Sequence, residues 1–281
     1  MNVPTARPAG FWERGGWMKA VLVAVVYLAL YVGIGQLVGL VFGHLLDDGG
    51  VFASGTNVFL LLVLPIGCGA AIIAAFLLLT RMWRPVFARQ PIAGRGWMWI
   101  AVVVVAYPVV LRLLGIGYGE YRPEVIALTF VAGVFIGIAE ELVTRGAAVT
   151  LLRRAGHREL TVAVISSAIF AAMHLVNALG TGFTPTIGIL LVYTFCFGVC
   201  MYLIMRVTGS IVWAIVAHAL TDPTLFLATG GIDAVAGGPQ NPLLVIAGTG
   251  NFAVIVFGII ALFLIRGRVG ANDAMIEDFA R

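Results

Sequence analysis

Six ionisable side chains suited to acid–base chemistry lie inside apolar stretches of this sequence, in three short motifs. The motifs are EELVTR (Glu140–Arg145), FAAMH (Phe170–His174) and HALTD (His218–Asp222). A charged side chain at the centre of a bilayer costs about 2.5 to 3.5 kcal/mol on insertion scales, so such groups usually face one another around a reaction site or an ion path. Two histidines and three carboxylates therefore predict a polar site inside an apolar protein.

Helical spacing assigns different positions to the two glutamates. Arg145 follows Glu141 by four residues, the spacing at which an acid and a base meet on one face of a helix. Glu140 points about 100° away from Glu141, because a helix has about 3.6 residues per turn. We expect an ion pair between Glu141 and Arg145, and we expect Glu140 to face the other polar helices as a general base.

The other two motifs supply partners for that base. His218 and Asp222 are also four residues apart, so both can face one cavity, and Phe170 lies one turn before His174 as a wall of that cavity. A carboxylate and a histidine around a water molecule generate a hydroxide-like nucleophile, and further donors stabilise the oxyanion that forms when water attacks an amide. The residue types thus favour a hydrolase.

The elements that position these residues are apolar helices. Of the 281 residues 61% are hydrophobic and 11% are charged, and the mean hydropathy is +1.06. This composition is typical of a polytopic membrane protein and predicts an all-α fold with eight transmembrane helices in one integral membrane domain over residues 1–281. The apolar stretches cover residues 18–43, 57–80, 97–117, 125–152, 161–178, 185–205, 210–229 and 242–265.

Positive charges in alternate connections predict the orientation. Arginines cluster in the N-terminal tail, in the loops 81–95 and 153–158, at Arg206 and after residue 265, whereas the intervening loops hold five acidic residues and one arginine. Because cytoplasmic loops carry an excess of arginine and lysine, we expect both termini in the cytoplasm. The net charge of +4 is explained in this way, and we expect no nucleic-acid partner.

The polar residues share a depth in the membrane. At about 1.5 Å per residue, Glu140, His174 and Asp222 lie roughly 20 Å from the cytoplasmic ends of their helices, and His218 lies roughly 14 Å from its end. One polar layer can contain all four side chains.

Two other features are interpreted as structural. Glycines recur at every fourth residue of the first and fourth apolar stretches, which predicts close contacts between helices. They are Gly35, Gly39 and Gly43, and Gly133 and Gly137. Arg112 lies about six residues from the outer end of its helix, and we expect it to reach outward to the interface or to pair with Glu120 or Glu124.

The three motifs together resemble those of a known family. The CAAX proteases and bacteriocin-processing enzymes (CPBP intramembrane proteases), which are related to the Ras-converting CAAX prenyl endopeptidase, carry EExxxR, FxxxH and HxxxN or HxxxD on successive membrane helices. The present sequence has all three in this order, within residues 125–229. The resemblance implies an eight-helix intramembrane endopeptidase with its catalytic core in that range.

The resemblance also implies roles for individual residues. By this resemblance, Glu140 and His174 activate water. His218 and Asp222 lie on the side of the oxyanion and stabilise it, and Glu141 and Arg145 support the site. A carboxyl group donates a hydrogen bond only when protonated, so Asp222 must be neutral in this role.

Cofactor and substrate stay open at this point. Glu140, His174, His218 and Asp222 include enough nitrogen and oxygen ligands for a divalent metal such as zinc, but they have no compact metal-binding spacing, and we favour a mechanism without metal. We expect a membrane-associated peptide or protein as substrate, prenylated or not, and the lipid bilayer as surroundings. A single lysine, Lys19, among many arginines indicates a GC-rich bacterial genome and hence a bacterial plasma membrane.

Two functions of other classes compete with this hypothesis. A catalytically silent, bacteriocin-immunity-type protein keeps the same motifs but only binds a peptide. A proton-coupled transporter also uses intramembrane carboxylates and histidines. Transporters commonly have repeated halves with broken helices in corresponding positions, and the sequence has no such repeat.

The loop charges predict the outcome of reporter fusions. Fusions after Arg89 and after Arg158 are expected to report a cytoplasmic location, and fusions near Asp48 and Asp233 an external one. An external reporter after Arg158 would contradict the eight-helix topology.

Overall fold

The described part of the chain folds into a bundle of eight apolar helical spans. A computed structural model describes residues 10–177, 182, 184–232 and 241–270. Within these residues, the spans long and apolar enough to cross a membrane are Trp17–Leu45, Gly55–Leu79, Gly96–Gly115, Pro123–Arg154, Glu159–Val176, Pro185–Thr208, Ile211–Thr229 and Pro242–Leu264. They agree with the eight predicted stretches to within a few residues, so the all-α polytopic fold is confirmed.

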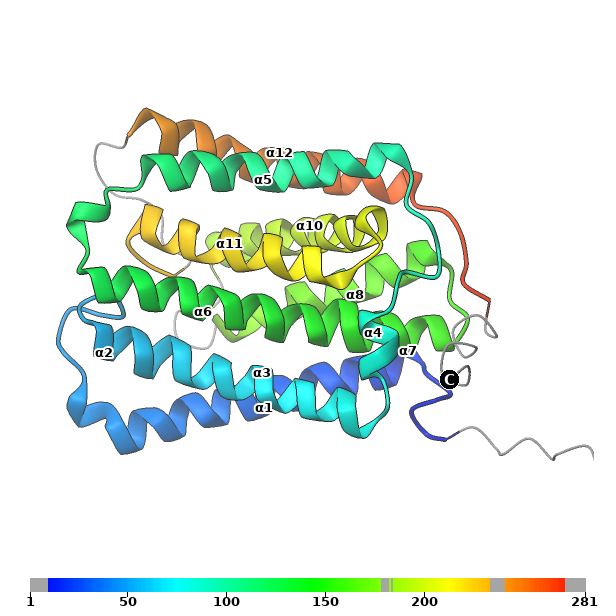
Figure 1. Cartoon of the computed structure of the whole chain (residues 1–281), viewed down its shortest axis with the longest axis horizontal. Helices are drawn as coiled ribbons and strands as arrows, with labels where there is room; N and C mark the ends of the chain where they lie inside the picture. Colours follow the sequence, from blue (N-terminus) through cyan, green and yellow to red (C-terminus); the bar gives the residue numbers. More distant parts are fainter. Residues whose placement is uncertain (1–9, 178–181, 183, 233–240, 271–281) are drawn as a thin grey trace, which may run out of the picture.

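The long helices lie side by side along the bundle (Figure 1). On one side α5 packs against α12, and on the opposite side α1 packs against α3, while α6, α8, α10 and α11 lie between these pairs. The bounds are α1 (Trp17–Phe42), α3 (Leu64–Leu79), α5 (Trp99–Gly115), α6 (Pro123–Glu141), α8 (Glu159–Met173), α10 (Pro185–Thr208), α11 (Ile211–Thr229) and α12 (Pro242–Leu264). The three motifs are therefore on interior helices, away from most of the lipid-facing surface.

Short segments modify or connect these helices. They are η1 (Gly43–Leu45), α2 (Gly55–Val58), a π-helix at Phe59–Val63, α4 (Trp83–Phe87), η3 (Gly96–Met98), η4 (Tyr118–Glu120), a π-helix at Leu142–Ala148, α7 (Val149–Arg154) and η6 (His174–Asn177). The second π-helix continues α6 and contains most of EELVTR. Single π turns inside α-helices often occur at functional sites, because the wider turn re-aims the side chains near it.

Small residues allow α6 and α11 to approach closely. A Cβ atom at Gly137 would lie 2.6 Å from the carbonyl oxygen of Ile215, and one at Gly133 would lie 2.6 Å from that of Ala219. Pro223 lies inside α11 and has no N–H, so the Ala219 carbonyl lacks its usual helical partner. The predicted contact through Gly133 and Gly137 is therefore present, and it brings the two glutamates next to His218 and Asp222.

The prediction for the glycines of the first helix is wrong. A Cβ at Gly35, Gly39 or Gly43 would meet no atom of the described part of the chain within 4 Å. Spacing alone identifies a face of small residues, but contact also requires a helix opposite that face, and α3 packs elsewhere on α1.

The arginine-bearing loops meet at one end of the bundle. Arg153 forms a two-pronged bond with Glu159, through Nε at 2.9 Å and Nη2 at 2.7 Å, and the hydroxyl of Tyr202 also donates to Glu159. Arg206 donates to the carbonyl of Ala93 at 2.9 Å. These contacts join α7, α8, α10 and the 81–95 loop at the end where the sequence predicts the cytoplasm. Asp233, assigned to the opposite side, lies outside the described residues.

Alanine substitutions at two glycines test the role of the α6–α11 contact. Gly137→Ala places a methyl group against backbone atoms of α11, and overpacking of this kind typically costs about 1 to 3 kcal/mol. We expect a lower unfolding temperature in detergent and less folded protein. Gly39→Ala is the matched control, because its methyl group enters open space and alanine favours the helix. Equal stability of the two variants would contradict the close contact.

Candidate active site

His218 lies at the centre of the polar cluster. Its Nδ1 is 2.8 Å from Glu141 Oε1, and its Nε2 is 3.5 Å from Asp222 Oδ2 and 3.7 Å from Glu140 Oε2. Since a carboxylate only accepts hydrogen bonds, Nδ1 carries the proton in the short contact with Glu141. One imidazole ring thus connects the three carboxylates of two motifs.

Glu141 and Arg145 form the predicted ion pair. Arg145 Nη1 is 3.1 Å from Glu141 Oε1, and both side chains are fully buried. Nη1 also donates to Thr144 Oγ1, and Nη2 donates to the carbonyl oxygen of Gly198 on α10, each at 2.6 Å. The guanidinium carbon lies 4.9 Å from the centre of the Phe170 ring. This pair is thus held from three helices and is closed to solvent.

The expected separation of the two glutamates is only partly correct. The prediction directed Glu140 alone toward the other polar helices, but Glu141 contacts Arg145 and His218 through the same oxygen. Both glutamates can face α11, because the His218 ring lies between them and directs Nε2 toward Glu140 and Nδ1 toward Glu141. Glu140 remains the more accessible of the two, with 19% of its side chain exposed against 0% for Glu141.

His174 lies at the end of a helix rather than inside one. It is the C-cap of α8 and the first residue of η6. Its Nδ1 is 3.0 Å from the carbonyl oxygen of Phe170, and because a carbonyl cannot donate, Nδ1 is the donor and Nε2 of the neutral ring is an acceptor. Glu140 is within electrostatic range of His174, but no ion pair within 4 Å joins them in the described residues. Contact with Glu140 comes instead from His218.

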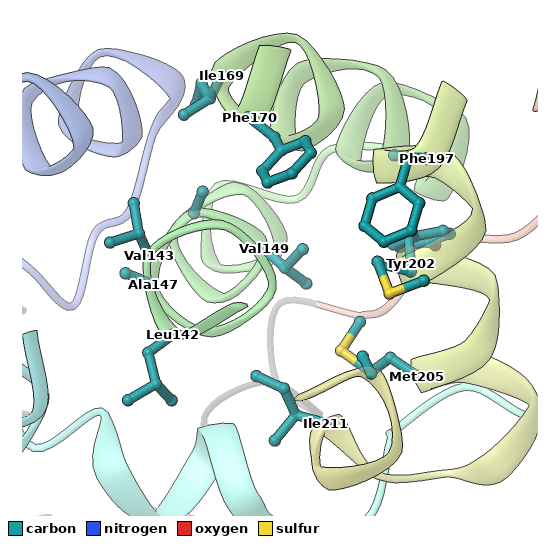
Figure 2. Close-up of a cluster of buried hydrophobic side chains, with 14 of the residues drawn as sticks. Leu142, Val143, Ala147, Val149, Ile169, Phe170, Phe197, Tyr202, Met205 and Ile211 are labelled. Atoms are coloured by element: carbon teal, nitrogen blue, oxygen red, sulfur yellow. The ribbon is translucent and has the colours of Figure 1, made fainter. Parts of the chain in front are cut away.

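Aromatic rings enclose both histidines. The Phe170 ring is 4.9 Å from His174 and 5.6 Å from His218 between centroids, and Phe197 of α10 is 5.1 Å from His218, all edge-on. Figure 2 shows Phe170 and Phe197 among packed apolar side chains that include Val149. An apolar enclosure of this kind strengthens the electrostatic interactions inside it, because the local dielectric constant is low.

Two tyrosines near the site have no signal in the motifs. Tyr27 and Tyr31 of α1 stack with centroids 6.4 Å apart, and both lie within electrostatic range of Glu140. The hydroxyl of Tyr27 is buried and has no hydrogen-bond partner among the residues that the structure describes. The packing of α1 against α3 and against the π-helix at Leu142–Ala148 brings them there.

The prediction for Arg112 is wrong. Its side chain is buried in the bundle, and Nη2 donates to Asn251 Oδ1 of α12 at 3.4 Å. No ion pair with Glu120 or Glu124 forms among the described residues. Snorkelling was expected from the distance to the helix end, but α5 turns this face toward α12, so the side chain points inward.

A hollow of about 560 Å³ lies on another face of α11. Apolar side chains of α5, α10 and α11 line it, including Trp99, Trp213 and Leu220, and none of the six ionisable motif residues borders it. The hollow is therefore separate from the polar cluster.

The described residues do not fit a metal ion. No group of three or more histidine, cysteine, aspartate or glutamate side chains within them has the arrangement of a metal site. We therefore derive no step through a metal.

Comparison with known proteins identifies the same region. Residues 122–224 match the family model described as type II CAAX prenyl endopeptidase Rce1-like. The match includes all three motifs and confirms the resemblance to the CAAX proteases. No curated protein and no solved structure matches the chain.

Replacement of one buried glutamate tests the structural role of the ion pair. Glu141→Gln leaves the Arg145 guanidinium without its charge partner, and breaking a buried pair in this way is expected to cost about 3 kcal/mol. The measurement is the unfolding midpoint in detergent. Glu140→Gln is the matched control, one residue earlier on a partly exposed side chain, and should unfold close to the wild type. A Glu141→Gln protein as stable as the wild type would contradict this role.

Proposed function

From the match of residues 122–224 to the Rce1-like CAAX endopeptidase family, we propose that this protein is an intramembrane endopeptidase that hydrolyses a peptide bond in a membrane-associated substrate. The observation that carries the proposal is the contact of three carboxylates, Glu140, Glu141 and Asp222, with one imidazole inside an apolar bundle. Structural packing alone does not require so many charged groups in one place, because each is costly to bury.

The proposed reaction begins with a water molecule between Glu140 and His174. Glu140 takes a proton from this water, and the unprotonated Nε2 of His174 accepts its second hydrogen bond and orients it. The resulting hydroxide attacks the carbonyl carbon of the scissile peptide bond. The partial exposure of Glu140 supports this assignment, because a general base must reach the substrate.

Donors on α11 then stabilise the tetrahedral intermediate. His218 acts here as an imidazolium: its Nδ1–H donates to Glu141, which holds the ring, and its Nε2–H donates to the oxyanion together with a protonated Asp222. Glu140 returns its proton to the amide nitrogen as the C–N bond breaks. The products are a new carboxyl terminus and a free amine, and the enzyme regains its starting state.

The site is closed to the solvent at its structural core and partly open at its reacting groups. Glu141 and Arg145 are fully buried, whereas Asp222 is 21% exposed and Glu140 19% exposed. We infer that a peptide reaches the site from within the membrane. We further propose that this is a bacterial plasma membrane and that both termini of the protein lie in the cytoplasm.

A single substitution separates hydrolysis from binding or transport. The wild type, incubated in detergent with a peptide library, should release products detectable by mass spectrometry, and Glu140→Gln should abolish them while the protein stays folded. Extensive washing with a chelator should leave the rate unchanged. Near-normal turnover by Glu140→Gln would contradict the mechanism. So would a stoichiometric bound metal whose removal by the chelator abolishes activity. A silent binding protein or a transporter would yield no products with either protein.

The role of Asp222 predicts three different pH–rate profiles. Asparagine donates a hydrogen bond at every pH, whereas aspartate donates only when protonated. Asp222→Asn should therefore remain active and extend activity to higher pH, and the wild type should decline as the carboxyl ionises. Asp222→Ala should lose about a hundredfold in rate, as deletion of an oxyanion donor typically does. A folded but inactive Asp222→Asn protein would end this assignment in favour of an ionised Asp222 that orients His218.

A further inference from the structure

Arg112 is a buried cation whose hydrogen bonds are incomplete. Its side chain is 3% exposed, and its one hydrogen bond in the described residues is the long contact of 3.4 Å with Asn251. Nη1 is buried and has no partner, and no carboxylate among the described residues lies within 4 Å of the guanidinium. Burial of a charged group without a paired charge is costly, and an unpaired donor adds to that cost.

Other buried arginines of the bundle are paired. Arg145 lies 3.1 Å from Glu141, and Arg153 lies 2.7 Å from Glu159. Arg206 lies 3.8 Å from Glu159 and also donates to the backbone. Arg112 differs from these three because the neighbouring helices offer it an amide in place of a carboxylate.

The position of Arg112 connects it to the candidate active site. It lies on α5, which packs against α10, α11 and α12. The ionisable groups within its electrostatic range are Asp222 of α11, Tyr193 of α10 and Tyr107 of its own helix. Counted at about 1.5 Å per residue from the starts of these parallel helices, Arg112 lies roughly 20 Å along α5 and Asp222 roughly 17 Å along α11. Arg112 thus lies at nearly the same depth in the bundle as Asp222, within electrostatic range of it.

We propose that Arg112 binds a carboxylate of the peptide substrate and so fixes which peptide bond lies at Glu140. This inference rests on the proposed function. A guanidinium presents a planar fork of donors that matches a carboxylate, and the pair is strongest where water is excluded. The carboxylate belongs either to the C-terminus of the peptide or to an acidic side chain.

A binding measurement tests the proposal without hydrolysis. The Glu140→Gln protein, in detergent, is mixed with an equimolar pool of apolar peptides, each present with a free C-terminal carboxylate and as its C-terminal amide. The peptides retained with the protein are quantified by mass spectrometry. We expect the acid forms to be enriched over the amides by at least tenfold, because truncation of one partner of a desolvated charge pair has a large effect on binding.

Variants at Arg112 assign the preference to this side chain. Glu140→Gln combined with Arg112→Gln should retain acids and amides equally, and Arg112→Lys should restore part of the enrichment, since it keeps the charge but loses the fork. Arg122→Gln is the matched control, because Arg122 is also near the end of a span, but its side chain is 69% exposed. Elution as a single folded species is required of each variant, and Arg112→Lys carries the test if Arg112→Gln misfolds.

A second pool identifies the source of the carboxylate. All its peptides end in an amide and carry glutamate or glutamine at one internal position. If the glutamate forms are enriched, and the enrichment is lost when Arg112 is replaced, the carboxylate belongs to a side chain. If only the acid forms of the first pool are enriched, the carboxylate is the C-terminus. Equal retention in both pools, or an enrichment unchanged by Arg112 substitutions, would overturn the proposal.

The outcomes also separate this proposal from the proposed function. If the wild type cleaves no peptide but carboxylates are retained through Arg112, the result would support carboxylate binding at Arg112 and contradict the protease function. Equal cleavage rates and equal retention in both pools, for acid against amide and for glutamate against glutamine, would support the protease and contradict carboxylate binding at Arg112.

Discussion

The buried ion pair between Glu141 and Arg145 is the interaction on which the site depends. Both side chains are fully enclosed, so each charge is tolerable only because the other lies 3.1 Å away. The same pair determines how three helices meet, since Glu141 Oε1 also contacts His218 of α11 and Arg145 Nη2 donates to the Gly198 carbonyl of α10. A Cβ at position 198 would lie 2.9 Å from that Nη2 and 3.0 Å from Ser167 Cβ, so a larger residue would displace the guanidinium or α8.

A second constraint acts on the backbone rather than on charge. The polar side chains of α6 and α11 meet because Gly133 and Gly137 allow the two helix axes to come close. Pro223 leaves the Ala219 carbonyl at this contact without its helical N–H partner. The π-helix at Leu142–Ala148 widens the turn that carries Arg145, and the guanidinium carbon of Arg145 lies 4.9 Å from the centre of the Phe170 ring. Packing thus places Glu140 beside the Glu141–Arg145 pair, where its side chain is still partly accessible. It lies next to the His218 ring, which Glu141 holds in position.

The sequence predicts the helices and their ionisable residues well, and the contacts between helices less well. Span boundaries follow from hydropathy, and the Glu141–Arg145 pair follows from spacing within one helix. Contacts that depend on the neighbours of a helix are not contained in its own pattern. Gly35 and Gly39 repeat like Gly133 and Gly137 but face no helix, and Arg112 lies near a helix end but faces α12. For the same reason the contact of His218 with both glutamates, and the approach of Tyr27 to Glu140, required the tertiary structure.

The central claim is that Glu140 activates water and does not itself attack the substrate. Oxygen-18 labelling tests this claim most directly. In a single turnover with excess enzyme in H₂¹⁸O, water activated by Glu140 should place one ¹⁸O atom in the new carboxyl terminus of the product and none in the enzyme. Mass spectrometry of the product and of the enzyme peptide that contains Glu140 measures both. An unlabelled product together with ¹⁸O in the Glu140 carboxyl would show a covalent acyl intermediate and would contradict the account.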